Sequence, residues 1–505
     1  MEQKVLTLHD KCSIMYMGYH QMEVCMNNLI FDTIATLVRL SMTLLGDGEV
    51  EEIKENEEVV ALAEEFLSPT DRNDDISLRY ESIIKECENR KDYYFVRAAI
   101  CLLDLSVESE RIVEYYDFNT MKISSAKDKS FRGLNSNIDK TGIIILPKVK
   151  TLKALSKHAT ASGEHWPRKN ANDWLEDINT RLNKVYYIDS SKLSGYTIRN
   201  YLFSDPVQQC EDTEVIRIGV SPIIKEKLED LLDIKRYYGT TSDGRHSTQL
   251  FGVERLLNQD LIKRRTMLAF ERACAEKCDI FISPEMLGTD ELLSVDDDGT
   301  SELFRPNLKN AFHTPFLILP PTGWRDRHNI LSVFNNEGEK IGEQHKQNRF
   351  GLKREGAVWL EDLKKSNKEI LLIHINGWGR FAFPICIDFL TPTYRNVLTD
   401  QIKATFLLCP SFSKGAYNFD LTSGNDSEFE VRSVWINSCS AYEENDTDYV
   451  GVVSVPTCLD RSRRIRIKPE CEGACKDICL FAVDIPKDCN DEKREVKVTH
   501  IYESK

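Results

Sequence analysis

Three polar residues of the sequence, a glutamate, a lysine and a cysteine, each follow an apolar run of the kind that forms a buried strand. Glu285 lies in CDIFISPEMLG, Lys346 ends GEKIGEQHK, and Cys386 lies in GRFAFPICID. The ends of strands are where open α/β sheets place their reactive groups. A thiol there acts as a nucleophile when one group removes its proton and another stabilises the oxyanion that it creates. The three residues together predict an active site.

Each of these residues also has a purely structural interpretation. Cysteine is among the most buried residue types, so Cys386 on an apolar strand can be a packing residue. Glu285 after a proline can be a solvated loop residue, and Lys346 can be a surface lysine beside His345. The conjunction of the three, rather than any one of them, favours chemistry.

The elements that must position these residues begin near Thr213, where strand and helix patterns start to alternate. EVIRIGVSP is an alternating strand, and a long helix over roughly 252–277 separates it from CDIFISPEM. Two hairpins follow, with turns at Asn336-Glu337-Gly338 and Asn376-Gly377. ATFLLCPS, a helix through VRSVWINSCSAY, GVVSVP and DICLFAVDI complete the set. This order predicts an α/β (α+β) domain with a mixed sheet layered by helices.

The chain before this point has a different character. Residues 1–116 carry apolar residues at helical spacing, and we expect a helical N-terminal region whose third run, from Ile76 to Tyr116, breaks near Lys91-Asp92. Residues 117–212 are a mixed segment or linker, with strands at 142–146 and VYYID and no assigned role. The catalytic domain is expected over 213–488, and 489–505 is a charged tail.

Composition narrows the class of protein. The 505 residues are 41% hydrophobic, enough for sizeable cores, and their formal net charge of -15 makes nucleic acid an unlikely partner. The start of the chain lacks the order of a signal peptide, and its longest apolar region shows helical rather than uniform hydrophobicity, so we expect a cytoplasmic protein that spans no membrane.

The 15 cysteines are scattered and odd in number, which favours reduced thiols. Cys471, Cys475 and Cys479 are spaced C-x3-C-x3-C, which matches neither the usual zinc nor the ferredoxin spacing, so no metal is expected there. The sequence contains no GxGxxG, P-loop or GxSxG motif, and no organic cofactor is expected either. The basic run 461–468 is interpreted as a solvated or interface hairpin, with an anionic partner as the alternative.

The ordered set FISPEMLGT, NEGEKIGEQHK, GRFAFPICID and ATFLLCPS resembles the carbon–nitrogen hydrolase (nitrilase) superfamily over about 213–488. That family carries a glutamate after a proline, a lysine after a hairpin and a nucleophilic cysteine after an apolar strand. Glu285, Lys346 and Cys386 match these positions in the same order. The resemblance implies a nitrilase-like α-β-β-α sandwich that needs no cofactor or metal and pairs into a homodimer or larger homo-oligomer.

The resemblance also assigns roles to the matched residues. Glu285 would be the base that takes the thiol proton and the acid that later protonates the departing amine, a role suited to an enclosed carboxyl with a raised pKa. Lys346 would stabilise Cys386 and the oxyanion, with the backbone N–H of Ile387 as a second donor. The product would be a thioester, which is hydrolysed or passed to another nucleophile.

Two features depart from the family pattern. A second glutamate often orients the lysine and the attacking water, and Glu355 is the best candidate here, with Glu361 as the second choice. The aromatic-Pro-Glu triplet that often follows the nucleophile is replaced by FLTPTYRN. The departures concern the substrate pocket more than the nucleophile.

The sequence therefore predicts a cysteine-dependent hydrolase of a non-peptide C–N bond in an amide, carbamoyl or nitrile substrate. Its large N-terminal region would be regulatory or bind a protein partner, and such architectures suggest a bacterial immune or signalling role. One alternative is a catalytically idle scaffold or ligand sensor that assembles partners. Another is an acyltransferase that forms an amide through the same thioester.

Overall fold

The computed structural model describes fifteen stretches of the chain, and the statements below concern these residues: 29–44, 76–107, 131–134, 138–149, 178–180, 182–203, 215–240, 247–354, 356–364, 368–425, 431–441, 448–456, 463–470, 475–487 and 495–504. Two compact units are present. Unit 1 comprises Met1–Ser124, Phe131–Lys148 and Pro167–Lys192, and unit 2 comprises Ser125–Ser130, Val149–Trp166 and Leu193–Lys505. No helix in the described stretches is both long enough and apolar enough to cross a bilayer.

Unit 1 combines helices with a two-stranded antiparallel sheet. Its main elements are a helix over 29–44, α3 (Ile76–Arg90), α4 (Tyr93–Ser106), α6 (Ile138–Thr141), β1 (Ile143–Pro147) and β2 (Val185–Asp189). The break predicted at Lys91-Asp92 is confirmed, because the Asp92 side chain accepts hydrogen bonds from the first N–H groups of α4. The buried carboxylate of Asp104 accepts from three successive backbone N–H groups at 183–185 and so ties α4 to β2.

Unit 2 is built on two large sheets. One contains eight of the described strands in the order β11-β10-β8-β7-β4-β20-β21, with β9 beside β10. These are β4 (Val215–Val220), β7 (Ile280–Ile282), β8 (Leu317–Leu319), β9 (Gly323–Arg325), β10 (His328–Phe334), β11 (Lys340–His345), β20 (Cys475–Pro486) and β21 (Lys497–Ser504). The central strands β4, β7 and β8 are parallel, which agrees with the predicted strand–helix–strand order.

The second sheet contains seven of the described strands in the order β19-β18-β17-β16-β15-β14-β3. These are β3 (Thr197–Phe203), β14 (Glu369–Ile375), β15 (Gly379–Ala382), β16 (Phe406–Pro410), β17 (Arg432–Ile436), β18 (Gly451–Val455) and β19 (Arg463–Ile467). Both predicted hairpins are confirmed: β10 pairs with β11, and β14 pairs with β15. Gly338 and Gly377 supply the positive φ angles, 80° and 85°, that these turns require.

The two sheets pack face to face. Gly342 of β11 lies so close to Leu371 of β14 that a Cβ atom on the glycine would come within 2.9 Å of the leucine methyl carbons. Beside this contact, the rings of Phe316 and Trp378 pack edge to face with centroids 4.9 Å apart. A residue larger than glycine at 342 would push the sheets apart, because interiors of this kind have no spare volume.

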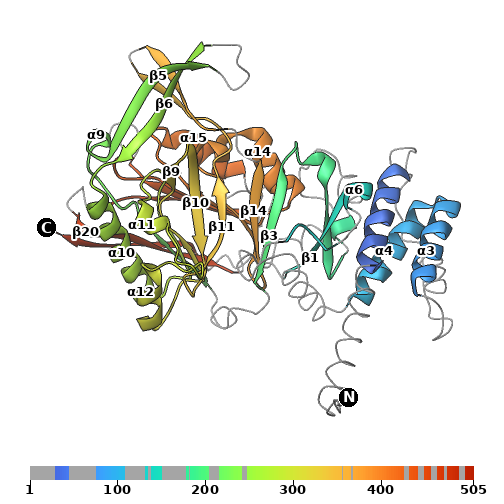
Figure 1. Cartoon of the computed structure of the whole chain (residues 1–505). Helices are drawn as coiled ribbons and strands as arrows, with labels where there is room; N and C mark the ends of the chain where they lie inside the picture. The colour runs from blue at the N-terminus through green and yellow to red at the C-terminus, as the bar shows by residue number, and fades with distance from the viewer. Residues whose placement is uncertain are drawn as a thin grey trace, which may run out of the picture. The chain divides into compact units, whose positions relative to one another are not determined.

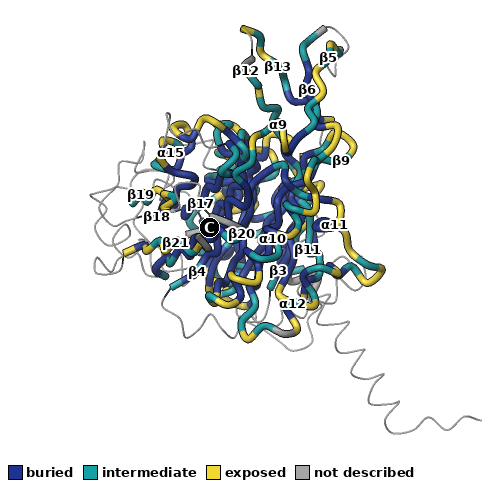
Figure 2. Tube along the Cα trace, turned by 90° about the vertical axis from the view of Figure 1, so that its left-hand side faces the viewer, coloured by how far each residue is buried: buried dark blue, intermediate teal, exposed yellow. Residues whose placement is uncertain are grey.

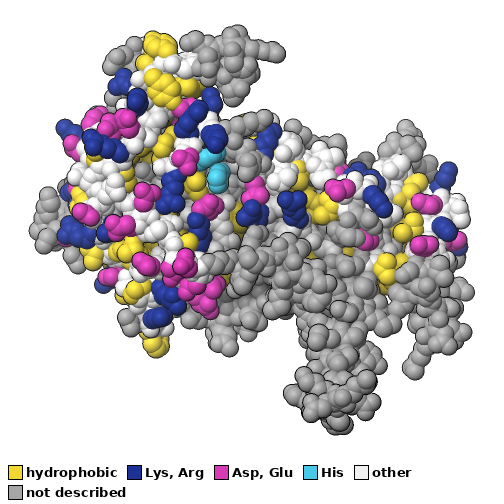
Figure 3. All heavy atoms as spheres, in the orientation of Figure 1, with side chains coloured by type: hydrophobic (Ala, Val, Ile, Leu, Met, Phe, Trp, Pro, Cys, Tyr) yellow, Lys and Arg dark blue, Asp and Glu magenta, His cyan; other side chains and the backbone are white. Residues whose placement is uncertain are grey.

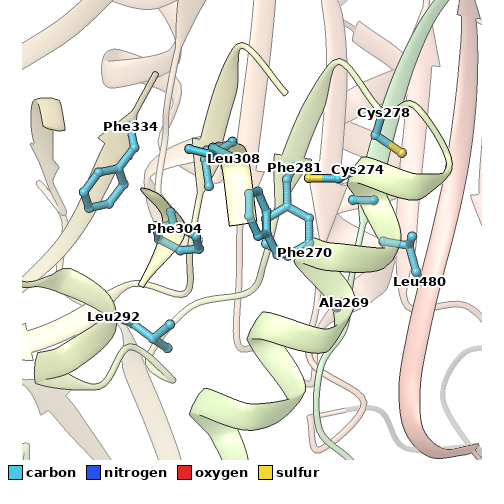
Figure 4. Close-up of a cluster of buried hydrophobic side chains, with 12 residues drawn as sticks. Ala269, Phe270, Cys274, Cys278, Phe281, Leu292, Phe304, Leu308, Phe334 and Leu480 are labelled. Atoms are coloured by element: carbon cyan, nitrogen blue, oxygen red, sulfur yellow. The ribbon is translucent and has the colours of Figure 1, made fainter. Parts of the chain in front are cut away.

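Helices cover both outer faces, which confirms the predicted α-β-β-α layering (Figure 1). Helices α10 (Gln259–Ala275) and α12 (Phe304–Asn310) cover the eight-stranded sheet, and Figure 4 shows the apolar cluster that joins them to it. Helices α13 (Ile387–Leu390), α14 (Pro392–Asn396) and α15 (Ala416–Gly424) belong to the other layer. There the Phe419 ring of α15 stacks on Trp435 of β17 with centroids 4.7 Å apart.

A four-stranded sheet rises beyond the sandwich, and we call it the arm (Figures 1 and 2). It consists of β5 (Leu232–Thr240), β6 (Ser247–Leu256), β12 (Gly351–Arg354) and β13 (Ala357–Glu361), in the order β12-β13-β6-β5. The short helix α9 (Leu228–Leu231) leads into it. The arm was not predicted from the sequence, because a single helix was expected over roughly 252–277. The first turn of that helix is the end of β6, and α10 begins only at Gln259.

Three other expectations differ from the structure. VRSVWINSCSAY contains strand β17, buried along its whole length, instead of a helix. The segment 117–212 is not one linker, since β1 and β2 belong to unit 1 while β3 pairs with β14 in unit 2. The charged tail from 489 ends in β21, which pairs with β20 at the sheet edge.

Candidate active site

The described residues predicted to do chemistry meet where strands of both large sheets end. Glu285 follows β7 and Lys346 follows β11, both in the eight-stranded sheet. Cys386 follows β15 in the seven-stranded sheet and directly precedes α13. All three side chains are almost fully buried. Residues from one sheet therefore meet a residue from the other between the layers.

A buried ion cluster forms the centre of the site. The Lys346 Nζ atom lies 2.6 Å from Oε1 of Glu285 and 2.7 Å from Oε2 of Glu361. Burial by itself lowers the pKa of the Lys346 ammonium, but the two carboxylates outweigh it and raise that pKa well above its usual value. The lysine is therefore a permanent positive charge held between two acids.

Glu361 is the second carboxylate of this cluster, and it was the second choice of the sequence analysis. Its Oε2 atom also accepts a 3.0 Å hydrogen bond from the backbone N–H of Phe350, while its buried Oε1 atom has no hydrogen-bond partner among the described residues. Burial raises the pKa of Glu361, and Lys346 opposes the rise. Glu355, the first choice, lies outside the described residues, and its role stays a prediction.

Three partners fix the position of the Glu285 carboxylate. Besides Lys346, the side chain of Asn329 donates to Oε1 at 2.7 Å, and the backbone N–H of Phe412 donates to Oε2 at 2.9 Å. The Asn329 amide is itself oriented by the Thr322 hydroxyl, which donates to its oxygen at 2.6 Å. Sequence reasoning missed Asn329, because an asparagine inside a strand has no distinctive local pattern.

Cys386 has an unusual backbone conformation, with φ = 50° and ψ = -112°. Such a conformation in a residue other than glycine costs about 1–3 kcal/mol and tends to occur at functional sites. It is held in place by the Cys386 N–H, which donates to Pro410 at 2.9 Å. Burial, and then the nearby Glu285 carboxylate, raise the pKa of the Cys386 thiol, whereas Lys346 lowers it. The thiol therefore stays protonated until a base takes its proton.

The buried Asp388 links the segments that carry the lysine and the cysteine. Its carboxylate accepts hydrogen bonds from the backbone N–H groups of Gln347 and Asn348, at 3.0 and 2.8 Å, and from the Asn348 side chain at 2.8 Å. Burial raises the pKa of Asp388 to about 7, and these donors oppose the rise. The aspartate two residues after the cysteine thus fixes the distance between Lys346 and Cys386.

The arm holds Glu361 in place through the next residue, Asp362. The backbone N–H of Asp362 donates to Phe251 of β6 at 2.7 Å. Its buried carboxylate accepts hydrogen bonds from the Tyr237 hydroxyl of β5 and from the Arg327 guanidinium. Burial, and then this hydrogen bond, raise the pKa of Tyr237 to about 12, so the hydroxyl remains a donor at neutral pH. Glu361 depends on the arm for its position.

The other sequence candidates lie apart from this cluster. Cys475 begins β20, Cys479 lies within it with Sγ 3.3 Å from the imidazole Nε2 of His500, and Cys471 is outside the described residues. The described residues contain no group of three side chains suited to a metal ion. In the basic run, Arg464 and Arg466 of β19 both pair with Asp420 of α15, which agrees with a structural hairpin.

No protein-family model matches the sequence, and no curated protein matches it. Solved structures of members of the nitrilase superfamily do match. A mutant amidase of this superfamily from Nesterenkonia AN1 is 14% identical, and the match covers 55% of this chain and 94% of that chain at a TM-score of 0.34. Nit3 from Saccharomyces cerevisiae, a member of branch 10 of the superfamily, is also 14% identical, with 54% and 91% covered and a TM-score of 0.34.

A carbon–nitrogen hydrolase from Helicobacter pylori is 13% identical, with 54% of this chain and 90% of that chain covered and a TM-score of 0.32. The matches thus include members of the superfamily that the sequence resembles, over about half of the chain. Similarity at this identity and TM-score transfers no activity, so the chemistry of this chain has to follow from its own site.

Proposed function

We propose that this chain is a carbon–nitrogen hydrolase that cleaves a non-peptide amide through a thioester on Cys386. The observation that carries the proposal is the buried meeting of a thiol, a carboxylate and an ammonium group, with Glu285 bonded to Lys346 at 2.6 Å and acting on the pKa of Cys386. A structural ion pair does not need a thiol in a strained backbone conformation beside it.

In the first half of the reaction, Glu285 accepts the thiol proton while the sulfur of Cys386 attacks the amide carbonyl carbon. The Lys346 ammonium and the backbone N–H of Ile387 stabilise the negative charge on the carbonyl oxygen. Glu285 then gives its proton to the amine nitrogen as the carbon–nitrogen bond breaks. The products of this half are ammonia or an amine and an acyl thioester on Cys386.

In the second half, a water molecule replaces the amine. Glu285 accepts a proton from the water as its oxygen attacks the thioester, and the carboxylic acid leaves as the proton returns to the sulfur of Cys386. The buried Oε1 of Glu361 has no partner among the described residues, and so it can accept a hydrogen bond from the substrate amide or from this water. Glu361 would thereby orient both reactants.

A small electrophilic amide tests this proposal directly. Acrylamide has the size of a simple amide substrate and alkylates thiols, so we expect it to label Cys386 before the other fourteen of the chain's 15 cysteines. Peptide mapping by mass spectrometry measures the order of labelling, and an amide substrate should slow the reaction at Cys386. Uniform labelling, together with no turnover of any simple amide, would instead support the idle scaffold.

Removing one hydroxyl from the arm tests the link to Glu361. We expect Tyr237→Phe to lower the free energy of unfolding by about 1–2 kcal/mol, because Asp362 loses a charge-assisted hydrogen bond. It should also lower kcat about threefold to tenfold and change KM less, since Glu361 is displaced rather than removed. Tyr417→Phe on α15, where the ring is exposed, is the matched control. Equal effects of the two variants would contradict the link.

A further inference from the structure

The arm has one face that continues into the active site. Strand registers place Arg236, Phe251 and Glu361 in one row across β5, β6 and β13. Because side chains alternate along a strand, Tyr238, Gln249 and Trp359 form the next row on the same face, about 7 Å farther out.

The inner end of the same face reaches the other catalytic carboxylate. Ile234 and Val253 lie one row inward from Arg236 and Phe251, and they belong to an apolar cluster that includes Met286 and Phe412. Met286 directly follows Glu285, and the backbone N–H of Phe412 binds the Glu285 carboxylate. The face therefore runs from the surroundings of Glu285, past Glu361, to the outer part of the arm.

The aromatic rings of the outer row lie beside a positive charge from the inner row, the guanidinium of Arg236. The centroids of the Trp359 and Tyr238 rings are 5.9 Å apart. The guanidinium carbon of Arg236 also lies 5.9 Å from the centroid of the Trp359 ring. Tyr238 is 71% exposed, and Arg236 is exposed as well. Figure 3, which has the orientation of Figure 1, shows hydrophobic side chains gathered on the arm with Lys and Arg side chains beside them.

These groups have a defined binding preference. Tyrosine and tryptophan rings present flat apolar faces that stack on flat ligand groups, and a guanidinium pairs with carboxylate or phosphate groups. A buried aromatic cluster would serve packing alone, but this row is exposed and lies beside a carboxylate that contacts the catalytic lysine. This row leads inward to the residues that surround the buried thiol. A substrate needs that proximity to the thiol, whereas a separate protein partner does not.

We propose that the outer row, through Tyr238 and Trp359, together with Arg236 of the adjacent inner row, binds the part of the substrate that does not react, and that this part is flat and carries an anionic group. The inference rests on the proposed function for the chemistry at Cys386, but it concerns specificity. The anion lies on the Arg236 guanidinium, whose carbon is 5.9 Å from the Trp359 ring, the flat group lies against Trp359 and Tyr238, and the amide lies on the inner side of these rings, at Glu361 and Cys386. Remote contacts of this kind position the reacting bond.

Three small amides measure this preference. Para-carbamoylbenzoate is flat and anionic, benzamide is flat and neutral, and isobutyramide is neither. We expect kcat/KM to be highest for para-carbamoylbenzoate and to exceed that of benzamide about tenfold or more. Arg236→Gln should reduce the ratio of these two values toward one, and Trp359→Leu should reduce the ratio of benzamide to isobutyramide. Lys235→Gln and Val358→Ala, which change the opposite face of the arm, should leave both ratios unchanged.

Binding without turnover separates this inference from the proposed function. We expect the Cys386→Ala chain to bind para-carbamoylbenzoate in isothermal titration calorimetry about tenfold more tightly than the Cys386→Ala/Arg236→Gln chain. That difference in affinity would support the proposed binding of a flat, anionic group at this row even if no amide were hydrolysed. Hydrolysis of isobutyramide with no preference for the other two amides would contradict the proposed binding role of the row, while the proposed hydrolase activity would still be supported. Equal or absent binding by both chains would also contradict that binding role.

Discussion

Replacing Cys386 with alanine is expected to lower the rate of amide hydrolysis about ten-thousand-fold or more and to abolish labelling by acrylamide. The reason is that the thiol forms the covalent bond, and losses of this size accompany removal of a nucleophile. The free energy of unfolding should change little, because alanine keeps the Cβ atom and the backbone strain at φ = 50° is the same. Steady-state kinetics and urea unfolding of the same preparations measure both quantities.

Cys409→Ala provides the matched control for this variant. Cys409 is also a fully buried thiol, it lies on the neighbouring strand β16, and burial likewise raises the pKa of its thiol. Its sulfur is 3.7 Å from the Ser411 hydroxyl, and it takes no part in the proposed reaction. We expect this variant to keep most of its activity. If both variants were equally active, the thioester mechanism would be wrong; if both were equally inactive, loss of packing would explain the result.

Replacing Lys346 with methionine is expected to abolish activity and to destabilise the chain by about 3–5 kcal/mol. Methionine has a similar length but no charge, so Glu285 and Glu361 would face each other in a buried space without the ammonium that pairs with both. Removing one partner of a buried ion cluster has a cost of this size, because the remaining charges are left uncompensated. Chemical unfolding measures the loss of stability, and single-turnover kinetics measures the loss of activity.

A second substitution separates the two effects of Lys346→Met. In the double variant Lys346→Met/Glu361→Gln, one of the two buried negative charges is gone, so much of the stability should return. Activity should stay absent, because no cation is left to stabilise the oxyanion. Lys340→Met on β11, the strand that precedes Lys346, is the control; there the lysine pairs with Glu343 near the surface, and stability should change by less than about 1 kcal/mol. Activity in the double variant would contradict the role given to Lys346.

The candidate catalytic residues that the sequence indicated share one property. Glu285, Lys346 and Cys386 each follow a strand whose apolar pattern is clear, and strand ends converge at an edge of a sheet. The pattern therefore indicated both that these residues would be held rigidly and that they would be near one another. The hairpin turns at Gly338 and Gly377 were predictable for a similar reason, since the left-handed conformation favours glycine.

Glu361 shows where this reasoning reached its limit. Its strand, β13, pairs with β6, which lies over one hundred residues earlier in the chain and was taken for the start of a helix. Without β6 there is no arm, and without the arm Glu361 loses the support that places it against Lys346. Asn329 was missed because its role depends on Glu285 at the end of β7, two strands away in the sheet, and Tyr237 was missed because its role depends on Asp362.

Local sequence patterns were sufficient to predict the layered α/β class of the second unit, its hairpins, and the thiol, carboxylate and ammonium groups available for chemistry. These follow from periodicity and turn residues, which are properties of neighbours along the chain. The three-dimensional structure was needed to show that Glu361 joins Lys346, how the arm reaches the site, and that β3 and β21 complete the two sheets. Such pairings depend on contacts between residues far apart in sequence, and no local pattern encodes them.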